Sequence, residues 1–344
     1  MSMSGLLIQK NRCCYVMPMA QMQLLPTIRN LQEKYFMEKN LTEWINTHVI
    51  QDTLYSVDEI PLNTYHILHE HSKGAILMIH GFCEFFGKYH EVFYRFYQEG
   101  YSVFFLELRG HGKSGNVNEY EDRRVSVGSF EEYVQDVSVM YEYMSSICKD
   151  EKKMLFAHSM GGGISTLYME KYPDDFSCAV LSSPMIAINY GTIPTQIIDL
   201  AGVYANVKRL DDDYAPGQSR WTGKYGYNES SSTDEERYAY QFNLRLKDSA
   251  YQTWGATWRW AKAARAACIK MMKNAGKLKT PILLFQAEYD SMVQNAAQNL
   301  LKKKTRCVTI VKVKNSKHEI FSTPDAIFEK YLKDIFDFYA IHAR

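Results

Sequence analysis

The amino-acid sequence predicts an α/β protein with a mostly parallel central sheet flanked by helices and with an inserted helical cap. Three observations carry this prediction. Short, nearly continuous apolar runs alternate with amphipathic segments of helical length up to residue 185, and the alternation resumes after residue 279. A stretch without clear strands, 186–278, separates the two parts. The chain has 344 residues, enough for one large domain with an insertion.

This pattern divides the chain into four segments. Residues 1–50 form an N-terminal arm with partial helical periodicity, and residues 51–185 form the first part of the sheet domain. Residues 186–278 form the helical cap, and residues 279–344 form the second part of the sheet domain.

The first part of the sheet domain alternates strands with helices. Strands are expected at 52–60, 63–68, 74–81, 101–108, 153–157 and 178–184. Helices are expected at 90–100, at 129–147 and directly after Ser159. Gly100 ends the first of these helices, and Ser129 with Glu132 three residues later is a capping-box pattern that marks the start of the second.

The second part continues the same rhythm. Strands are expected at 281–290 and 307–313, followed by a final helix over 324–339. Within the cap, the segment 251–272 predicts a helix, because apolar side chains recur there near one face. These side chains are Tyr251, Trp254, Trp258, Ala261, Cys268 and Met272.

Composition and charge narrow the class of protein. A net charge of +1 gives no electrostatic reason to expect a nucleic-acid partner. The seven cysteines are odd in number, scattered and without a CxxC pair, so neither a disulfide framework nor a zinc site is expected, and reduced thiols in a cytoplasm fit best. No run of 18 apolar residues predicts a transmembrane helix. Peripheral membrane contact and the oligomeric state are left open.

Ser159 is the candidate nucleophile. The segment "AHSMG" has the form small-x-Ser-x-small between an expected strand and an expected helix, which is the context of a nucleophile elbow. The turn is tight, so positions two residues away on either side must be small, and Ala157 and Gly161 satisfy this. The helix that follows directs N–H groups and positive dipole toward developing negative charge. The alternative is a glycine-rich connection with an incidental serine.

Two further residues complete a candidate triad in the chain order Ser, acid, His. Asp290 ends the strand at 281–290, and His318 follows the last expected strand. The imidazole would take the proton of Ser159, and the carboxylate would orient the imidazole. Glu288 is a rival acid on the same strand, and His158 is expected to be a packed side chain because it points away on a tight turn.

Two glycine-containing loops accompany the triad. The strand at 74–81 ends in His80 and Gly81, after which the N–H of Phe82 would join that of Met160 as an oxyanion hole. The second loop, "RGHGKSG" at 109–115, contains G-x-G-x-x-G, yet no apolar helix follows it as a dinucleotide site requires. A loop shaped by its glycines is the better interpretation.

Taken together, "HGFCEFFGKY", "LELRGHGKSG", "LFAHSMGGGISTLYMEKYP", "AEYDSMV" and "SKHEI" resemble the serine-hydrolase branch of the α/β-hydrolase superfamily. The similarity covers roughly residues 50–340 and is strongest to lysophospholipases of the bacterial L2 type and to monoacylglycerol lipases. It implies the α/β-hydrolase fold, Ser159, Asp290 and His318 as the triad, and Phe82 and Met160 as oxyanion donors. It also implies hydrolysis of a fatty-acyl ester without a cofactor.

The expected function is therefore that of a serine hydrolase acting on a lysophospholipid or monoacylglycerol through an acyl-enzyme. Substrate contacts are expected from Glu84 and from the cap residues Trp221, Trp254 and Trp258, although aromatic packing of the cap on the core explains the tryptophans equally well. Two alternatives stay open. One is a carboxylesterase or proline-type aminopeptidase on the same fold, and the other is a binding protein that has kept the fold without catalysis.

Overall fold

The computed structural model describes residues 40–116 and 120–342. The chain separates into two units, residues 1–44 and 45–344. Of the first unit, residues 40–44 are described, and they are helical. The remainder of the predicted N-terminal arm up to residue 39 lies outside the described residues.

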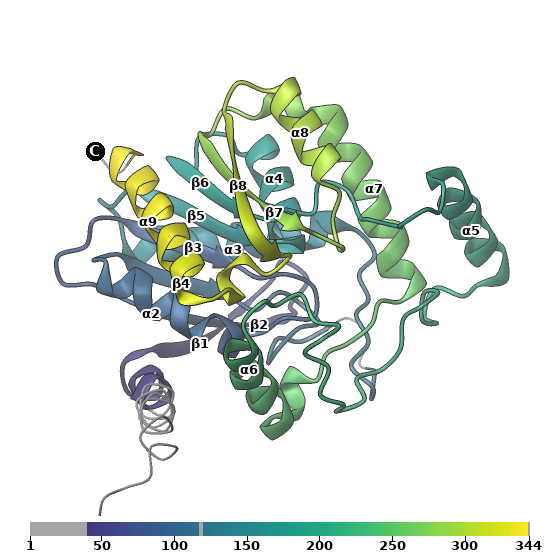
Figure 1. Cartoon of the computed structure of the whole chain (residues 1–344), viewed down its shortest axis with the longest axis horizontal. Helices are drawn as coiled ribbons and strands as arrows, with labels where there is room; N and C mark the ends of the chain where they lie inside the picture. Colours follow the sequence, from purple (N-terminus) through teal and green to yellow (C-terminus); the bar gives the residue numbers. More distant parts are fainter. Residues whose placement is uncertain (1–39, 117–119, 343–344) are drawn as a thin grey trace, which may run out of the picture. The chain divides into compact units, whose positions relative to one another are not determined.

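The strands of the second unit form one sheet in the order β1-β2-β4-β3-β5-β6-β7-β8 (Figure 1). Their bounds are β1 Ile50–Tyr55, β2 Pro61–Ile67, β3 Ala75–Ile79, β4 Ser102–Leu106, β5 Lys153–His158, β6 Cys178–Ser182, β7 Ile282–Tyr289 and β8 Val308–Lys317. β2 pairs antiparallel with β1 and β4, and every other pairing is parallel. The mostly parallel sheet predicted from the sequence is confirmed.

Helices cover both faces of the sheet (Figure 1). Their bounds are α2 His90–Gln98, α3 Phe130–Ile147, α4 Met160–Lys171, α5 Thr195–Lys208, α6 Glu235–Lys247, α7 Trp258–Asn274, α8 Asn295–Lys304 and α9 Asp325–His342. α3, α4 and α7 pack against one another on one face, whereas α2 packs on β4 and α9 on β6 at the other face. The predicted capping box opens α3, because Ser129 and Glu132 each accept a backbone N–H of this turn.

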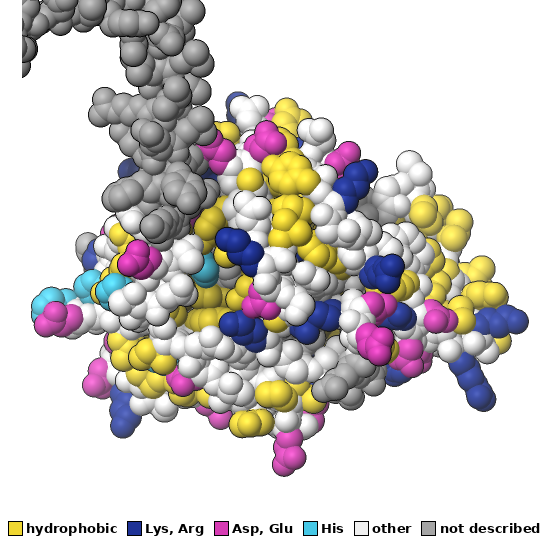
Figure 2. Space-filling model, turned by 90° about the horizontal axis from the view of Figure 1, so that it is seen from below, with side chains coloured by type: hydrophobic (Ala, Val, Ile, Leu, Met, Phe, Trp, Pro, Cys, Tyr) yellow, Lys and Arg dark blue, Asp and Glu magenta, His cyan; other side chains and the backbone are white. Residues whose placement is uncertain are grey.

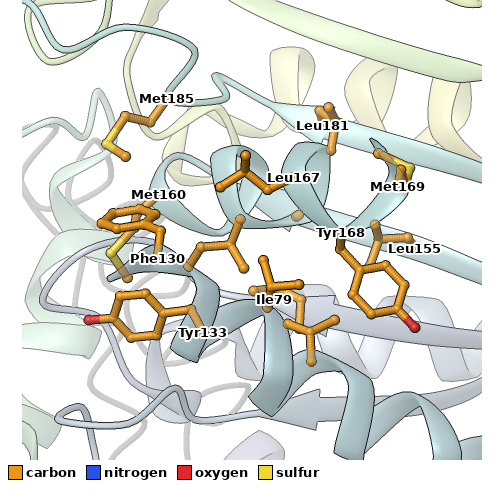
Figure 3. Close-up of a cluster of buried hydrophobic side chains, with 14 of the residues drawn as sticks. Ile79, Phe130, Tyr133, Leu155, Met160, Leu167, Tyr168, Met169, Leu181 and Met185 are labelled. Carbon is orange, nitrogen blue, oxygen red and sulfur yellow. The ribbon is translucent and has the colours of Figure 1, made fainter. Parts of the chain in front are cut away.

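The largest part of the hydrophobic core lies between the sheet and the α3–α4 layer (Figure 3). Ile79, Leu155 and Leu181 project from three adjacent strands, and all are fully buried. Phe130 and Tyr133 of α3 point toward Met160, the first residue of α4. Burying such side chains stabilises the fold by roughly 1.5–3 kcal/mol each relative to exposure, so the first turn of α4 is anchored in the core.

α7 begins seven residues later than the sequence pattern predicts. The helix starts at Trp258 with Thr257 as its cap, and the hydroxyl of Thr257 accepts the N–H of Trp260. Gly255 has φ +73°, which breaks the helix expected from residue 251, and Trp254 lies before this break. The apolar pattern runs through Gly255 without interruption, so periodicity alone could not locate the start.

The segment between β6 and α7 carries α5 and α6, and these two helices pack against different parts of the protein. α6 packs on the 3₁₀ helices at Phe86–Tyr89 and Ser249–Tyr251, and its Arg237 bonds Glu91 of α2 through two nitrogens at 2.8 Å each. α5 packs on α7 and projects away from the sheet (Figure 1). Among the described residues, no helix is both long and apolar enough to cross a membrane.

Candidate active site

Ser159 occupies the sharp junction between β5 and α4. Its φ of +51° and ψ of −117° form a conformation that residues other than glycine rarely adopt. Hydrogen bonds hold this backbone on both sides. The Ser159 N–H donates to the carbonyl of Ser182 at 3.0 Å, and its carbonyl accepts from the N–H of Met185 at 2.8 Å. The strained turn is thus fixed by the end of β6 and the loop beyond it.

The glycines after Ser159 allow α4 to approach the sheet closely. A Cβ atom on Gly161 would lie 2.5 Å from the carbonyl oxygens of Ile79 and His80, and one on Gly162 would lie 2.9 Å from Cα of Pro184. These neighbours are backbone atoms, which cannot move aside as a side-chain end can. The close approach brings the first turn of α4 against the loop that follows β3.

Asp290 and His318 follow two adjacent parallel strands, β7 and β8, and meet Ser159 at the carboxyl edge of the sheet. Nε2 of His318 lies 2.7 Å from Oγ of Ser159, and Nδ1 lies 2.8 Å from Oδ2 of Asp290. Oδ1 of Asp290 accepts the N–H groups of Met292 and Val293 at 2.9 and 3.0 Å. Three side chains distant in sequence therefore form one continuous hydrogen-bonded chain.

The electrostatics of the carboxylate set the proton positions in this chain. Burial opposes ionisation of Asp290, but the hydrogen bond and charge of His318, together with the two N–H groups, hold its pKa below the ordinary value. Asp290 is therefore ionised at neutral pH and can only accept. Nδ1 of His318 must then carry the proton, which leaves Nε2 free to accept the proton of the Ser159 hydroxyl.

Glu288 and His158 take no part in this hydrogen-bonded chain. Glu288 is exposed and accepts the N–H of Asn315 at 2.7 Å. His158 is buried, and its Nδ1 lies 3.0 Å from the carbonyl of Ser182. Burial lowers the pKa of His158 to about 4, so this imidazole is neutral, with its ring centroid 4.8 Å from that of His318.

Phe82 and Met160 lie on the two segments that the close approach of Gly161 brings together. Met160 is the first residue of α4, where N–H groups lack acceptors within the helix. Phe82 follows Gly81, whose N–H donates to the carboxylate of Glu84 at 2.6 Å. Within the described residues, neither the N–H of Phe82 nor that of Met160 donates to a protein acceptor. Both are available to a negatively charged oxygen.

The sequence profile of the family described as serine aminopeptidase, S33, matches residues 70–325. The chain belongs to this family. Its matched region contains Ser159, Asp290 and His318, together with the loop that carries Phe82. The membership agrees with the resemblance to serine hydrolases that the sequence motifs indicate.

Curated relatives of this S33 family chain include two lipid esterases. Lysophospholipase L2 of Escherichia coli strain K12 is 27% identical over 297 residues, which are 83% of this chain and 86% of that protein. Monoacylglycerol lipase of Mycolicibacterium smegmatis is 33% identical over 125 residues, which are 36% of this chain and 42% of that protein.

Among solved structures, a soluble variant of monoglyceride lipase from Saccharomyces cerevisiae is similar, with a TM-score of 0.68 at 19% identity. The match covers 85% of this chain and 95% of that chain. At this identity the likeness shows the fold alone, and the predicted α/β-hydrolase fold is confirmed.

A buried network of charged side chains in this S33 family chain lies next to the loop that carries Phe82. Glu84 is 5% exposed and accepts from Tyr89 at 2.5 Å and from Lys88 at 2.5 Å, in addition to the N–H of Gly81. Lys88 also pairs with Glu319, the residue after His318, at 2.7 Å. These protein donors occupy the carboxylate that the sequence assigns to substrate binding. Burial alone would raise the pKa of Glu84, but the charge of Lys88 and the hydrogen bonds to this carboxylate hold the pKa below its ordinary value.

Sequence reasoning missed Lys88 and Glu319. The spacing of Glu84 and Lys88, four residues apart, is the one local signal that could have suggested the pair. The contact between Lys88 and Glu319 joins residues far apart in the chain, and no local pattern encodes it.

The predicted substrate-binding tryptophans lie at three different places. Trp221 is half-buried, with its ring 6.3 Å from that of Phe242. Trp254 is 42% exposed, and Trp258 is half-buried at the start of α7. Their contact with substrate stays a prediction. Trp260 packs against the ring of Phe82 at 4.4 Å between centroids, and is the tryptophan that abuts this loop.

The "RGHGKSG" loop is explained by its packing. Gly110 and Gly112 have φ values of +75° and +54°, and a Cβ on Gly112 would overlap the carboxylate of Glu107. The fully buried Arg109 pairs with Asp58, Glu132 and Asp136, which ties this loop to α3. Within the described residues, no three His, Cys, Asp or Glu side chains cluster as a metal site requires.

Proposed function

We propose that this chain hydrolyses the fatty-acyl ester bond of a lysophospholipid or monoacylglycerol, with Ser159 as nucleophile, His318 as base and Asp290 as the orienting acid. The observation that carries the proposal is the unbroken hydrogen-bonded chain from Oγ of Ser159 through His318 to Asp290. The class of substrate rests on the relatives named lysophospholipase L2 and monoacylglycerol lipase.

The geometry supports a two-step acyl transfer. Oγ of Ser159 attacks the ester carbonyl carbon while its proton passes to Nε2 of His318. The carbonyl oxygen becomes an oxyanion, which accepts the N–H groups of Phe82 and Met160. The ester C–O bond then breaks, and His318 returns the proton to the departing alcohol. Water attacks the acyl-enzyme by the same route, the fatty acid leaves, and Ser159 regains its proton.

Asp290 contributes without accepting the proton. Its charge stabilises the imidazolium that forms in both steps, and its contact with Nδ1 keeps the tautomer in which Nε2 can accept. The N–H groups of Met292 and Val293 hold the carboxylate in place.

A surface of exposed apolar side chains on α5 supports a lipid partner. These side chains, at 50–75% exposure, are Ile197, Leu200, Val203, Tyr204 and Val207, with Ile193 two residues before the helix. α5 projects at the right in Figure 1, and hydrophobic side chains gather at the same edge of the molecule in Figure 2. Lys208 and Arg209 are exposed at the end of the same helix, where they suit phosphate head groups. Peripheral contact with a phospholipid surface through α5 is part of the proposal.

The decisive experiment combines active-site labelling with a substrate panel. A fluorophosphonate probe should label the purified protein and fail to label the Ser159→Ala variant. Turnover of lysophosphatidylcholine and monoacylglycerol should fall by orders of magnitude in the same variant. Labelling that survives Ser159→Ala would mean that another serine is the nucleophile, and absence of labelling and turnover in the unmodified protein would favour the binding-protein alternative.

The panel also separates the enzymatic alternatives. p-Nitrophenyl esters of increasing acyl length should be hydrolysed best at medium or long chains. Turnover confined to acetate esters would favour a small-ester carboxylesterase, and turnover of proline p-nitroanilide would favour the aminopeptidase.

A further inference from the structure

Hydrogen bonds of His80 and Glu84, both near Phe82 in the sequence, hold the loop that carries Phe82. Nδ1–H of His80 donates to the carbonyl of Gly81 at 2.7 Å, because Nε2 of the same ring accepts the N–H of Leu108 at 3.0 Å. The carbonyl of Gly81 and the N–H of Phe82 belong to one planar trans peptide unit and point in opposite directions. Glu84 holds the N–H of Gly81 from the other side. Together these contacts set the direction of the Phe82 N–H.

A third contact reaches this loop from the cap. Nη2 of Arg245, on α6, donates to the carbonyl of Cys83 at 2.6 Å. Cys83 directly follows Phe82 and has φ +57°, a left-handed conformation that is unfavourable for a residue with a side chain. The Arg245 guanidinium lies over the rings of Phe85 and Trp254, at 5.2 and 5.0 Å from their centroids. A strained residue of the loop is thus held by a cation that two aromatic rings keep in place.

The setting of Arg245 differs from that of other arginines at the cap. It is 8% exposed, and no ion pair involves it among residues 40–116 and 120–342. Burying a cation without a paired carboxylate is costly, and this cost is reflected in a pKa that burial lowers. Arg237, eight residues earlier on α6, instead pairs with Glu91 and Asp325. Arg237 attaches the cap to the core, whereas Arg245 donates its hydrogen bond to the loop that carries Phe82 (the oxyanion loop).

We propose that Arg245 is a positioning residue through which the cap helix α6 holds the oxyanion loop so that the Phe82 N–H points at the reacting carbonyl oxygen. The inference rests on the proposed function, since an oxyanion donor matters only where a tetrahedral intermediate forms. The cap then takes part in the chemical step as well as in enclosing the substrate. Movement of α6 away from the core releases Cys83 and weakens one of the two oxyanion donors.

The test is the Arg245→Met variant, which keeps an unbranched apolar side chain and removes the donor. With p-nitrophenyl octanoate, kcat should fall about 10-fold to 100-fold, short of the 10²–10³-fold loss that follows deletion of an oxyanion donor, while KM changes less than about threefold. Affinity for octylboronic acid, which forms a tetrahedral adduct with the serine, should fall by the same factor as kcat. Competition by octanol, which forms no such adduct, should be unchanged.

Arg237→Met is the matched control, because it removes the same residue type and its ion pairs from the same helix but leaves the contact of Arg245 with Cys83 in place. It should lower the thermal unfolding temperature and leave kcat and boronate affinity near those of the unmodified protein. Equal kcat in Arg245→Met and Arg237→Met, or equal losses of boronate and octanol binding in Arg245→Met, would overturn the proposal.

A second variant guards against misfolding of the first. Arg245→Gln keeps a polar head on a shorter side chain that ends short of the Cys83 carbonyl. Unchanged kcat and boronate affinity in folded Arg245→Gln would equally refute the role. Failure of the proposed function gives a different result, because fluorophosphonate labelling would then either persist in Ser159→Ala or be absent from the unmodified protein, whatever happens at Arg245.

Discussion

At the scale of single residues, the position of one carboxylate favours Asp290 over Glu288 as the acid of the proposed triad. Asp290 and Glu288 are two residues apart, yet Asp290 bonds Nδ1 of His318 and Glu288 bonds a backbone N–H on the exposed side. We expect Asp290→Asn to lower kcat by about 10³-fold to 10⁴-fold, because an amide can hold the imidazole in the wrong tautomer and cannot stabilise the imidazolium. Steady-state kinetics with p-nitrophenyl octanoate measure this.

Glu288→Gln is the control for this prediction, since it changes a carboxylate on the same segment. Its kcat should stay within about twofold of the unmodified protein, as for other surface substitutions away from the site. A large loss in Glu288→Gln with near-normal Asp290→Asn would reverse the assignment of the acid.

At the scale of elements, the first turn of α4 tolerates no extra atom where it meets β3. Gly161→Ala would place a Cβ 2.5 Å from two backbone carbonyl oxygens. We expect it to lower the free energy of unfolding by about 2 kcal/mol or more, in the range seen for overpacking. It should also reduce kcat, because shifting α4 displaces Met160 from the oxyanion position. Urea denaturation and kinetics on the same preparation measure both effects.

The matched control is Gly276→Ala, where a Cβ meets nothing within 4 Å. Its stability should be unchanged or raised by about 0.4–1 kcal/mol, because alanine restricts the unfolded chain. Gly161→Ala with unaltered stability and activity would show that α4 can move without harm.

The elements show what local sequence can and cannot predict. The candidate triad of Ser159, Asp290 and His318 could be proposed from the sequence because a strand, a tight turn and a helix each leave a local pattern, and the chemistry demands a fixed chain order. The start of α7 was not identifiable, because the apolar spacing continues across Gly255. The bond from Arg245 to Cys83 joins two distant segments, and neither residue signals its partner.

At the scale of the whole molecule, the apolar side chains of α5 face outward where a water-soluble surface would carry polar ones. Leu200 and Val207 are 68% and 75% exposed. We expect the double variant Leu200→Asp and Val207→Asp to bind phosphatidylglycerol vesicles at least about tenfold more weakly, because each side chain loses apolar burial worth roughly 1.5–3 kcal/mol. Co-sedimentation measures binding, and turnover of a short soluble ester should be unchanged.

Val57→Asp with Ile341→Asp is the control, since these side chains are 67% and 69% exposed at other places on the chain. Its vesicle binding should match that of the unmodified protein. Unchanged vesicle binding in the α5 variant, together with conversion of a dimer to a monomer in solution, would make α5 an interface between two copies instead.

The imidazole of His158 belongs to a set of rings that the folded chain keeps without charge. Burial lowers the pKa to about 4 for His80 and His158, and to about 3 for His90 and His111. The ordinary value is 6.5. Between pH 6.5 and 4 these imidazoles therefore bind protons in the unfolded chain but stay neutral in the folded chain. The folded state carries no penalty from these neutral rings above pH 6.5. Acidification below pH 6.5 should therefore lower the free energy of unfolding.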